Sequence, residues 1–489
     1  MFKILIPIFF PMIFGIILSV LSPKDRRNRN AYVIIVALTN TLASFGILET
    51  ERGNFYEILR FSEDLSLEFG VDGMSFIFAM IVTCLWVPAT IYAIEYMKHE
   101  GHENSFFTFF LMSYGVVLGV AFSGNLLTMY LFYELLTMST FPLVMHGHSP
   151  KALAAGKRYL TFSVAGASFG FIAMMVLLHL EIPFTFVYGG GTAALGPDNM
   201  NLVLTAYVLA FFGFGVKGGV FPFHIWLPSA GVAPTPVTAL LHAVAVVNAG
   251  VFAVLRVTYY SFGANLLYGT YAQYITMAFA AIGIVFGSAM ALRSTHIKLR
   301  LAYSTVSNLS YMLFSAAQLS PTGLMGALAH MTFHSVLKIT LFFVAGALLY
   351  ITGREYITQV TGLGKKMPIT FLCFTICSLG LIGVPPFIGI ISKWIIGQAA
   401  MENGNIISYL GVLALMVSAF LTCLYLFTII FPAYIPRGDY DENSVSDIKD
   451  PGPFMTVPML IMTVASIVIA IYSGKLLELI DFVSKGGAF

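Results

Sequence analysis

The chain has 489 residues, of which 58% are hydrophobic and 10% are charged, and its formal net charge is +2. Soluble domains carry about 25% charged residues, so this composition excludes an ordinary soluble protein and indicates one that lies in a membrane. A net charge this close to zero gives no reason to expect nucleic acid as a partner.

Apolar segments of about 20 residues, the length that a helix needs to cross a bilayer, recur along the whole chain. They predict an all-α polytopic membrane protein with about 14 transmembrane helices. The predicted spans are 2–22, 31–49, 74–98, 105–123, 124–146, 158–181, 201–222, 235–258, 273–292, 299–319, 322–351, 369–400, 405–432 and 454–478. The first is too long for the core of a signal peptide and is followed by "SPKDRRNRN", which has no small-residue cleavage site, so we expect it to be retained.

The basic residues predict the orientation, because cytoplasmic loops are rich in Lys and Arg. One side holds Lys24, Arg26, Arg27, Arg29, Lys98, Lys151, Lys157, Arg158, Arg293, Lys298, Arg300, Arg354, Lys365, Lys366, Arg437 and Lys449. The other side and the helix ends near it hold only Lys3, Arg52, Arg60, Arg256, Lys475 and Lys485. We therefore expect a multi-pass protein of the cell's inner (cytoplasmic) membrane with both termini on the outer side.

Ionisable residues lie deep within several predicted spans. Glu134 is the only carboxylate at the middle of a span, and His330, His334 and Lys338 are spaced i, i+4, i+8 along one helix face. The full set, here called the ionisable series, is Glu134, Lys217, His242, His330, His334, Lys338 and Lys393. Charged groups at this depth are costly and usually mark ion or proton routes, so the series predicts a proton path. For a single lysine, a structural ion pair is the alternative.

Glu134 and Lys217 are candidates for a proton switch. The charged form of a buried lysine is stabilised while a carboxylate lies beside it and destabilised when that carboxylate moves away or is neutralised. A change in their separation would therefore make the lysine take up and release a proton, and histidines suit the relay that follows.

Glycines and prolines interrupt two of the spans that carry lysines. Lys217 lies in "GFGVKGGVFP" and Lys393 follows "GVPPFIGIIS", in the seventh and twelfth predicted spans. Broken helices at corresponding places in two halves of a chain are typical of inverted repeats with an ion path at their interface. Such backbone survives in a membrane only where protein or enclosed water satisfies it.

Signatures of other chemistry are lacking in the sequence. The cysteines (Cys84, Cys373, Cys377 and Cys423) lie in apolar segments as small packing residues, and no dinucleotide fingerprint, P-loop or cysteine cluster is present. "HMTFH" lacks the glutamate of a zinc helix, and "GGG" at 189–191 has no helix start after it and indicates a loop. We expect no cofactor, no metal and no redox chemistry in this chain itself.

Several segments resemble one known family. They are "VDGMSFIF", "IYAIEYM", "NLLTMYLFYELLTMSTFPLV", "FGVKGGVFPFHIWLPSAGVAPTPVTALLHA", "KLRLAYSTVSNLSYM", "HMTFHSVLKITLFFVAG" and "GVPPFIGIISKW". Over about residues 68–400 the chain resembles the antiporter-like subunits of respiratory complex I. It is equally similar to subunits of Mrp-type cation/proton antiporters and of membrane-bound energy-converting hydrogenases.

The resemblance implies two inverted five-helix repeats with broken helices 7 and 12. The parts would be N-terminal helices 1–3 (1–104), a first repeat of helices 4–8 (105–258), a second repeat of helices 9–13 (259–432), and an inner loop with helix 14 (433–489). Glu134 matches the family's glutamate on the fifth helix and Lys217 its partner on the seventh. Lys338 matches the central lysine and Lys393 the terminal group, while His242, His330 and His334 fall at matching histidine positions.

One departure concerns the eighth helix, where many relatives carry a lysine and this chain has Asn248 in "VVNAGVF". An amide holds no proton at neutral pH, so passage there would depend on water and His242. If water fills the site, a lysine should be tolerated at this position.

The family implies a proton-translocating subunit of a redox-driven pump of the quinone oxidoreductase or membrane-bound hydrogenase type. Its partners would be other membrane subunits, including antiporter-like paralogues, peripheral redox subunits, lipid, and H⁺ or Na⁺. Two alternatives remain open: a subunit of an Mrp-type Na⁺/H⁺ antiporter without redox chemistry, and a non-conducting scaffold. The sequence leaves undecided which complex holds the chain, its electron donor and acceptor, and its stoichiometry.

Overall fold

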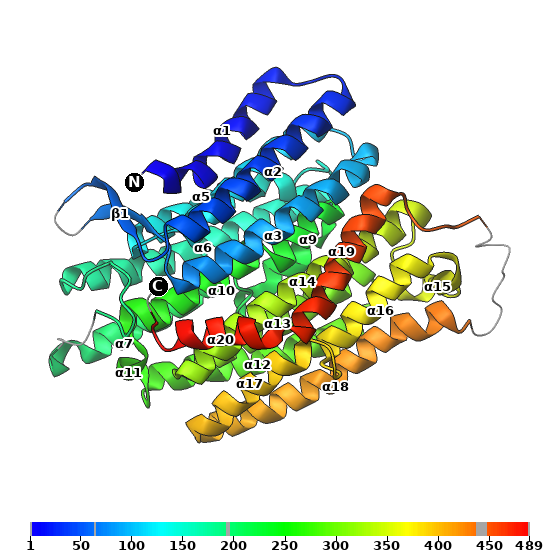
Figure 1. Cartoon of the computed structure of the whole chain (residues 1–489). Coiled ribbons are helices and arrows are strands. Elements are labelled where there is room, and N and C mark those ends of the chain that lie inside the picture. The colour runs from blue at the N-terminus through cyan, green and yellow to red at the C-terminus, as the bar shows by residue number, and fades with distance from the viewer. Residues whose placement is uncertain (1, 63–64, 192–195, 437–446, 488–489) are drawn as a thin grey trace.

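The computed structural model describes residues 2–62, 65–191, 196–436 and 447–487, and it is almost entirely helical (Figure 1). The first half contains α1 (Ile6–Leu21), α2 (Arg26–Thr50), α3 (Gly73–Tyr96), α4 (Glu103–Ala121), α5 (Leu126–Val144), α6 (Pro150–His179), α7 (Met200–Gly215), α8 (Trp226–Ser229), α9 (Thr235–Ala243) and α10 (Val246–Arg256). The second half contains α11 (Ala264–Leu267), α12 (Tyr271–Arg293), α13 (Ile297–Ala316), α14 (Pro321–Thr352), α15 (Leu363–Lys366), α16 (Pro368–Ile382), α17 (Gly389–Asn403), α18 (Ile406–Tyr434), α19 (Pro453–Ile471) and α20 (Ser473–Ser484).

Eleven helices of the described residues are long and apolar enough to cross a membrane. The other three predicted spans coincide with α7, with α13, and with the pair α16 and α17. α7 and α16 are short because the chain leaves helical geometry after Gly215 and after Ile382. α13 is a full-length helix, but its Ser, Thr, Asn, Lys and Arg side chains make it much more polar than the others. The fold is therefore an all-helical polytopic membrane protein.

Side-chain caps define several of the helix starts. Asp72, Asn125, Ser149 and Ser320 each accept a hydrogen bond from the backbone N–H three residues ahead, at the starts of α3, α5, α6 and α14. Such a cap satisfies one of the N–H groups that a helix start leaves without a partner. The short polar segments between apolar runs thus fix where α5 and α14, which carry much of the ionisable series, begin.

Two features of the backbone were not anticipated from the sequence. A two-stranded antiparallel hairpin, β1 (Phe55–Arg60) and β2 (Ser66–Gly70), follows α2. The predicted eighth span consists of α9 and α10, with an interruption at Val244 and Ala245, and it continues into a π-helical turn over Val257–Phe262. The chain therefore breaks a helix beside His242 as well as beside the two lysines.

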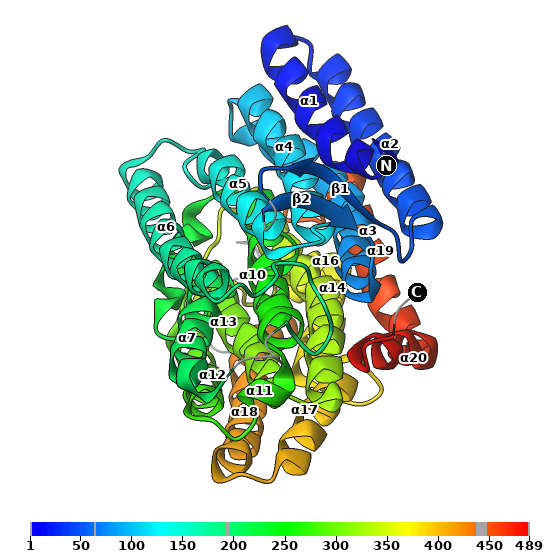
Figure 2. The same cartoon turned by 90° about the vertical axis from the view of Figure 1, so that its left-hand side faces the viewer.

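The helices form an elongated bundle with α14 and α10 near its middle (Figure 2). α1 and α2 lie at one end of that bundle and α17 and α18 at the other, while α20 turns away from α19 along the side (Figures 1 and 2). α14 is buried over most of its length, packed against α3, α9, α13, α16, α17, α19 and α20. Most of the predicted ionisable groups thus lie inside the bundle.

Candidate functional site: a buried series of ionisable side chains

Glu134 and Lys217 form an ion pair between α5 and the segment that follows α7. The Lys217 Nζ lies 3.4 Å from Glu134 Oε1, and it also donates a hydrogen bond to the carbonyl oxygen of Tyr133. Lys217 is 0% exposed, whereas the Glu134 side chain is 24% exposed. The structure therefore brings the two residues together, with the lysine fully enclosed and the carboxylate at the edge of the bundle.

The backbone around Lys217 explains how an ammonium is accommodated there. α7 ends at Gly215, and Lys217 and Gly218 lie against Gly250 of α10 so closely that a Cβ on Gly250 would come within 2.1 Å of the Gly218 nitrogen. The ring of Tyr133 faces the ammonium, with its centroid 3.4 Å from Nζ. Glycine at 250 is thus required for the close approach, and the aromatic face adds favourable cation–π contact.

His242 and Asn248 occupy the broken eighth span. His242 is 0% exposed, its ring lies 4.9 Å from that of Phe342, and neither ring nitrogen has a hydrogen-bond partner among the described residues. The Asn248 amide nitrogen donates to the carbonyl of Ala243 at 2.9 Å and to the Ser335 hydroxyl at 2.7 Å. Asn248 therefore links this span to α14, next to His334.

Lys338, the central lysine, is held by α13. Its Nζ donates to the Leu301 carbonyl at 2.8 Å and to the Ser304 hydroxyl, and it is 0% exposed. Within the described part of the chain no carboxylate lies within ion-pair distance of this ammonium. Neutral oxygens alone satisfy it, so its charge is less strongly stabilised than that of Lys217.

His330 and His334 lie on the same face of α14, with ring centroids 6.2 Å apart. His330 Nδ1 is 2.9 Å from the Ser392 hydroxyl of α17, and Nε2 is 3.1 Å from Asn308 Oδ1 of α13. His334 is 1% exposed and has no hydrogen-bond partner in the described protein. The predicted helical alignment of the two histidines is therefore present, and His330 is linked to both neighbouring helices.

Lys393 is the fifth residue of α17, after the break between α16 and α17. Its Nζ donates to the carbonyl oxygens of Leu381 (2.7 Å) and Ile382 (2.9 Å), which are left free where α16 ends. The nitrogen is 5.5 Å from the ring centroid of Tyr311. Lys393 also lines a cavity of about 530 Å³ between α17 and α18, together with Trp394, Gln398 and Met416.

Hydroxyl and amide groups that were not among the predicted site residues complete the arrangement. Tyr311 donates to the Ser418 hydroxyl at 2.7 Å. Ser304, Asn308 and Ser392 contact Lys338 or His330 directly, and Ser335 accepts a hydrogen bond from Asn248. Three of these groups lie on α13, whose segment "KLRLAYSTVSNLSYM" is unusually polar for a membrane span. That polarity was the signal that could have identified them.

The arrangement joins the ionisable series in two groups rather than one continuous chain of contacts. The first is the Glu134–Lys217 pair, and the second runs from Asn308 through His330 to Ser392, the neighbour of Lys393. His242, His334 and Lys338 lie between them. No group of three or more metal-ligating side chains occurs among the described residues.

Two family models match this chain. Residues 123–422 match the family model "NADH:quinone oxidoreductase/Mrp antiporter, TM", and residues 61–107 match "NADH-Ubiquinone oxidoreductase (complex I), chain 5 N-terminus". The chain belongs to this family of membrane subunits.

Curated relatives come from both branches of the family. NADH-quinone oxidoreductase subunit N of Desulforudis audaxviator is 28% identical over 97% of this chain and 96% of its own length. NAD(P)H-quinone oxidoreductase chain 5 of Picosynechococcus is 31% identical over 87% of this chain and 66% of its own length. Na(+)/H(+) antiporter subunit A1 of Staphylococcus haemolyticus is 28% identical over 97% of this chain but only 61% of its own length.

Solved structures share the fold. A chain of the archaeal membrane-bound sulfane sulfur reductase superposes with a TM-score of 0.86 at 22% identity, covering 99% of this chain and 97% of that one. A chain of the Mrp complex of Dietzia gives 0.84 at 19% identity, with the same two coverages. A chain of respiratory complex I of Thermus thermophilus gives 0.81 at 21% identity, covering 99% of this chain and all of that one. The resemblance to this family found in the sequence is thereby confirmed.

Proposed function

We propose that this chain is a proton-translocating membrane subunit of a multisubunit, redox-driven pump related to complex I. The observation that carries the proposal is the Glu134–Lys217 ion pair of 3.4 Å at a helix break, with Lys217 fully buried. Burying a cation at this depth is expensive, and charged groups within membrane spans usually mark ion or proton routes. The Glu134 side chain is partly exposed, so it has room to move away from Lys217.

The proposed path runs through the middle of the bundle. A proton taken up near Lys217 passes His242, Lys338, His334 and His330, and its release is controlled by Lys393. Buried ring nitrogens are nearly always hydrogen-bonded to protein or to water, so the nitrogens of His242 and His334 support enclosed water as the link between these groups. The Ser392 hydroxyl provides the last step from His330 toward Lys393.

The proposal also includes the arrangement of the whole chain in the membrane. Fourteen membrane-spanning segments would comprise helices 1–3 (1–104), two inverted five-helix repeats (105–258 and 259–432) and a final part (433–489), with both termini on the outer side. Antiporter-like paralogues would be neighbours in the membrane, and the redox chemistry would lie in other subunits. Protons are favoured over sodium because sodium prefers several hard oxygen ligands, while Glu134 is the only carboxylate in the series.

The test is proton pumping by the intact complex in proteoliposomes after Glu134→Gln. This change removes the charge and little volume, and removing such a general proton acceptor is expected to lower pumping at least about 100-fold while the complex still assembles. Glu402→Gln, at an exposed carboxylate beside Gln398 on α17, is the matched control and should leave pumping unchanged. Unaltered pumping in Glu134→Gln would favour the scaffold alternative.

An Mrp-type antiporter subunit is the second candidate, because relatives from that branch match the chain as extensively as those from the quinone oxidoreductases. The subunit composition and the transport activity of the purified complex distinguish the two candidates. Iron–sulfur or nickel–iron subunits that co-purify with this chain would support the redox-driven pump, and their absence together with Na⁺-dependent proton exchange would support the antiporter.

A further inference from the structure

A polar cavity far from the ionisable series lies where the α1–α2 turn meets the start of α4. Its volume is about 570 Å³, and we call it the hairpin cavity. Its walls include Ser22, Lys24, Arg26, Arg29, Glu103 and Asn104. The cavity lies at the ends of three apolar helices, which places it at the level of the membrane surface. It plays no part in the proposed proton path.

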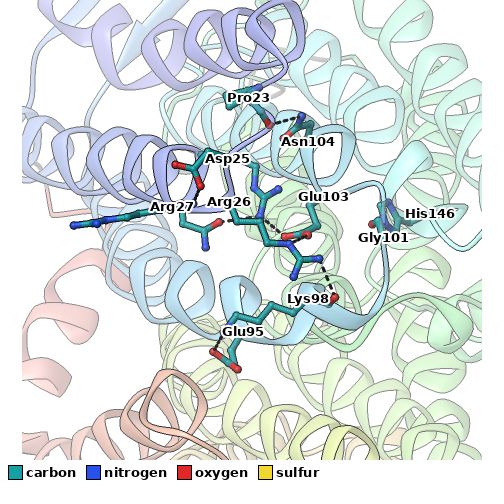
Figure 3. A network of polar contacts seen from close by, with 12 residues as sticks. Pro23, Asp25, Arg26, Arg27, Glu95, Lys98, Gly101, Glu103, Asn104 and His146 are labelled. Carbon is teal, nitrogen blue, oxygen red and sulfur yellow. Dashed lines mark hydrogen bonds and ion pairs between the residues drawn. The ribbon is translucent and has the colours of Figure 1, made fainter.

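Positive charge is in excess in the hairpin cavity. Glu103 is the only carboxylate among the described residues that line it. Its Oε1 is 2.9 Å from Arg26 Nε (Figure 3), and its Oε2 contacts Arg29 Nη2. Lys24, a third cation, also lines the space. Asp25, in the same turn, adds a second negative charge near Arg29. Three cations therefore outnumber two carboxylates, and an anion would balance the remaining positive charge.

Arg29 provides an independent sign that a ligand is expected. It is 4% exposed, it lines the cavity, and its Nε has no hydrogen-bond partner among the described residues. Arg29 Nη2 is occupied by Glu103 and by Asn30 Oδ1 at 3.1 Å. Asn104, which also lines the cavity, donates from its amide nitrogen to the Pro23 carbonyl at 3.2 Å (Figure 3). A buried guanidinium with a free donor is a usual partner of phosphate oxygens.

An apolar stripe leads to the mouth of the hairpin cavity. On α1, Ile13, Ile17, Val20 and Leu21 are 52%, 36%, 81% and 62% exposed, and their spacing places them on one face of the helix. Ser19 and Ser22, at the end of the same helix, already line the cavity. A ligand seated there would therefore have a charged end among the arginines and an apolar part along α1.

We propose that the hairpin cavity binds the phosphate of an anionic phospholipid from the leaflet on the side of Lys24, with the acyl chains along α1. Charge complementarity and the continuous apolar stripe favour a lipid over a free anion. A zwitterionic lipid would bring its own cation into a space that already holds three, so it should bind less well.

The test is a titration of the purified complex that contains this chain, by native mass spectrometry, with phosphatidylglycerol and with phosphatidylcholine of identical acyl chains. Phosphatidylglycerol is expected to bind at this site about fivefold or more tightly than phosphatidylcholine. Lys24→Gln should weaken phosphatidylglycerol binding about fivefold, the effect of one cation near the phosphate. Arg29→Lys keeps the charge that faces Glu103 but removes the Nε donor, and it should also weaken binding.

Arg27→Gln is the matched control. Arg27 is exposed in the same turn and its side chain points away from Glu103 (Figure 3), so its loss should change binding less than about twofold. Equal binding of the two lipids, or an equal effect of Arg27→Gln and Lys24→Gln, would overturn the proposal. Displacement of the lipid by millimolar inorganic phosphate would show a free-anion site instead. Carbodiimide cross-linking of Lys24 to an acidic residue of a neighbouring subunit in the lipid-saturated complex would show a protein partner there.

Discussion

The His330 imidazole of α14 lies 2.9 Å from the Ser392 hydroxyl of α17, the residue directly before Lys393. Asn308 Oδ1 faces the other ring nitrogen at 3.1 Å, and because that amide donates its own N–H to the Ser304 carbonyl, Oδ1 is an acceptor. His330 therefore carries its proton on Nε2, and Nδ1 accepts from Ser392. A second proton would have to enter or leave at Nδ1, on the Ser392 side of the ring. Ser392 thus connects His330 to Lys393, the last residue of the series.

Ser392→Ala is expected to slow translocation about 10-fold or more, because it removes the hydroxyl between His330 and Lys393 while leaving both of them in place. Proton pumping by the reconstituted complex measures this. The control is Ser378→Ala, at a buried serine of α16 whose hydroxyl has no hydrogen-bond partner in the described chain. If both variants pump at the rate of the unmodified protein, protons reach Lys393 by another route.

Asn248 is buried and hydrogen-bonded, which bears on whether a lysine is tolerated at this position. The sequence left open that water fills this site, in which case a lysine would be accepted. Asn248 is 0% exposed, and its amide bridges the Ala243 carbonyl and the Ser335 hydroxyl. The Asn248 Oδ1 has no hydrogen-bond partner in the described protein. Asn248→Lys would break both hydrogen bonds and place an ammonium at this buried site without a carboxylate, at an expected destabilisation of about 2–4 kcal/mol.

The yield and thermal stability of the assembled complex check this prediction. Asn248→Ala removes the same two hydrogen bonds without adding charge, so it should destabilise by only about 1–2 kcal/mol and serves as the comparison. An Asn248→Lys complex that assembles normally and is as stable as the original would mean that water does reach the site.

The membrane-spanning segments and the ionisable series were predictable because both depend on strong local signals. A run of about 20 apolar residues has few alternatives to a transmembrane helix, and a charge within it is conspicuous. The interruption before Lys217 was equally visible, since glycines and proline surround it. These features can be predicted without knowing which helices are neighbours.

The partners of the series were not predictable, because they depend on packing between distant segments. Ser304, Ser335 and Ser392 are ordinary helix serines in the sequence. The approach of α13 and α17 to α14 gives Ser304 and Ser392 a role, and the approach of α10 gives Ser335 its contact with Asn248. The break at Val244 lacks any glycine or proline, so the sequence contains no signal for it. Tertiary contacts, rather than local preference, set the geometry at these places.

Asp72, whose side chain is 18% exposed, and Arg256 form an ion pair that supports the bundle away from the series. Arg256 is 0% exposed, its Nη2 donates to Asp72 Oδ1 at 2.6 Å, and the same carboxylate caps α3. Arg256→Gln would leave the Asp72 charge without its partner, and we expect a loss of about 3–5 kcal/mol in stability. Thermal unfolding of the complex measures the loss.

A double variant tests whether the loss comes from the unpaired charge. Asp72→Asn combined with Arg256→Gln should be more stable than Arg256→Gln alone, because no uncompensated charge is then buried. Arg60→Gln, at an exposed residue that pairs with Glu57 in β1, should change stability by less than about 1 kcal/mol. Additive effects of the two substitutions would argue against a direct coupling.

His146, beyond the end of α5, gives the structure a pH dependence near the start of α4. Burial lowers the pKa of this imidazole below its ordinary value. The hydrogen bond between its Nε2 and the Gly101 carbonyl partly opposes that shift, whereas the nearby charges of His102 and His148 lower the pKa further. The folded state therefore binds protons less readily than the unfolded chain. The stability that His146 contributes is complete above about pH 6.5 and is lost as the pH falls from there through the lowered pKa.

Hydrogen exchange of residues 99–103 and 145–149, corrected for the intrinsic pH effect, should accordingly become faster between pH 7.5 and pH 5.5. The expected loss is at most about 1.4 kcal/mol of local stability for each unit by which the pKa is lowered. His146→Gln keeps a side-chain N–H for the Gly101 carbonyl but cannot be protonated, so its exchange should show little pH dependence. His179→Gln, at an exposed histidine at the end of α6, should retain the full pH dependence. If His146→Gln behaved like His179→Gln, protonation of His146 would not be what loosens the contact between the α3–α4 and α5–α6 connections.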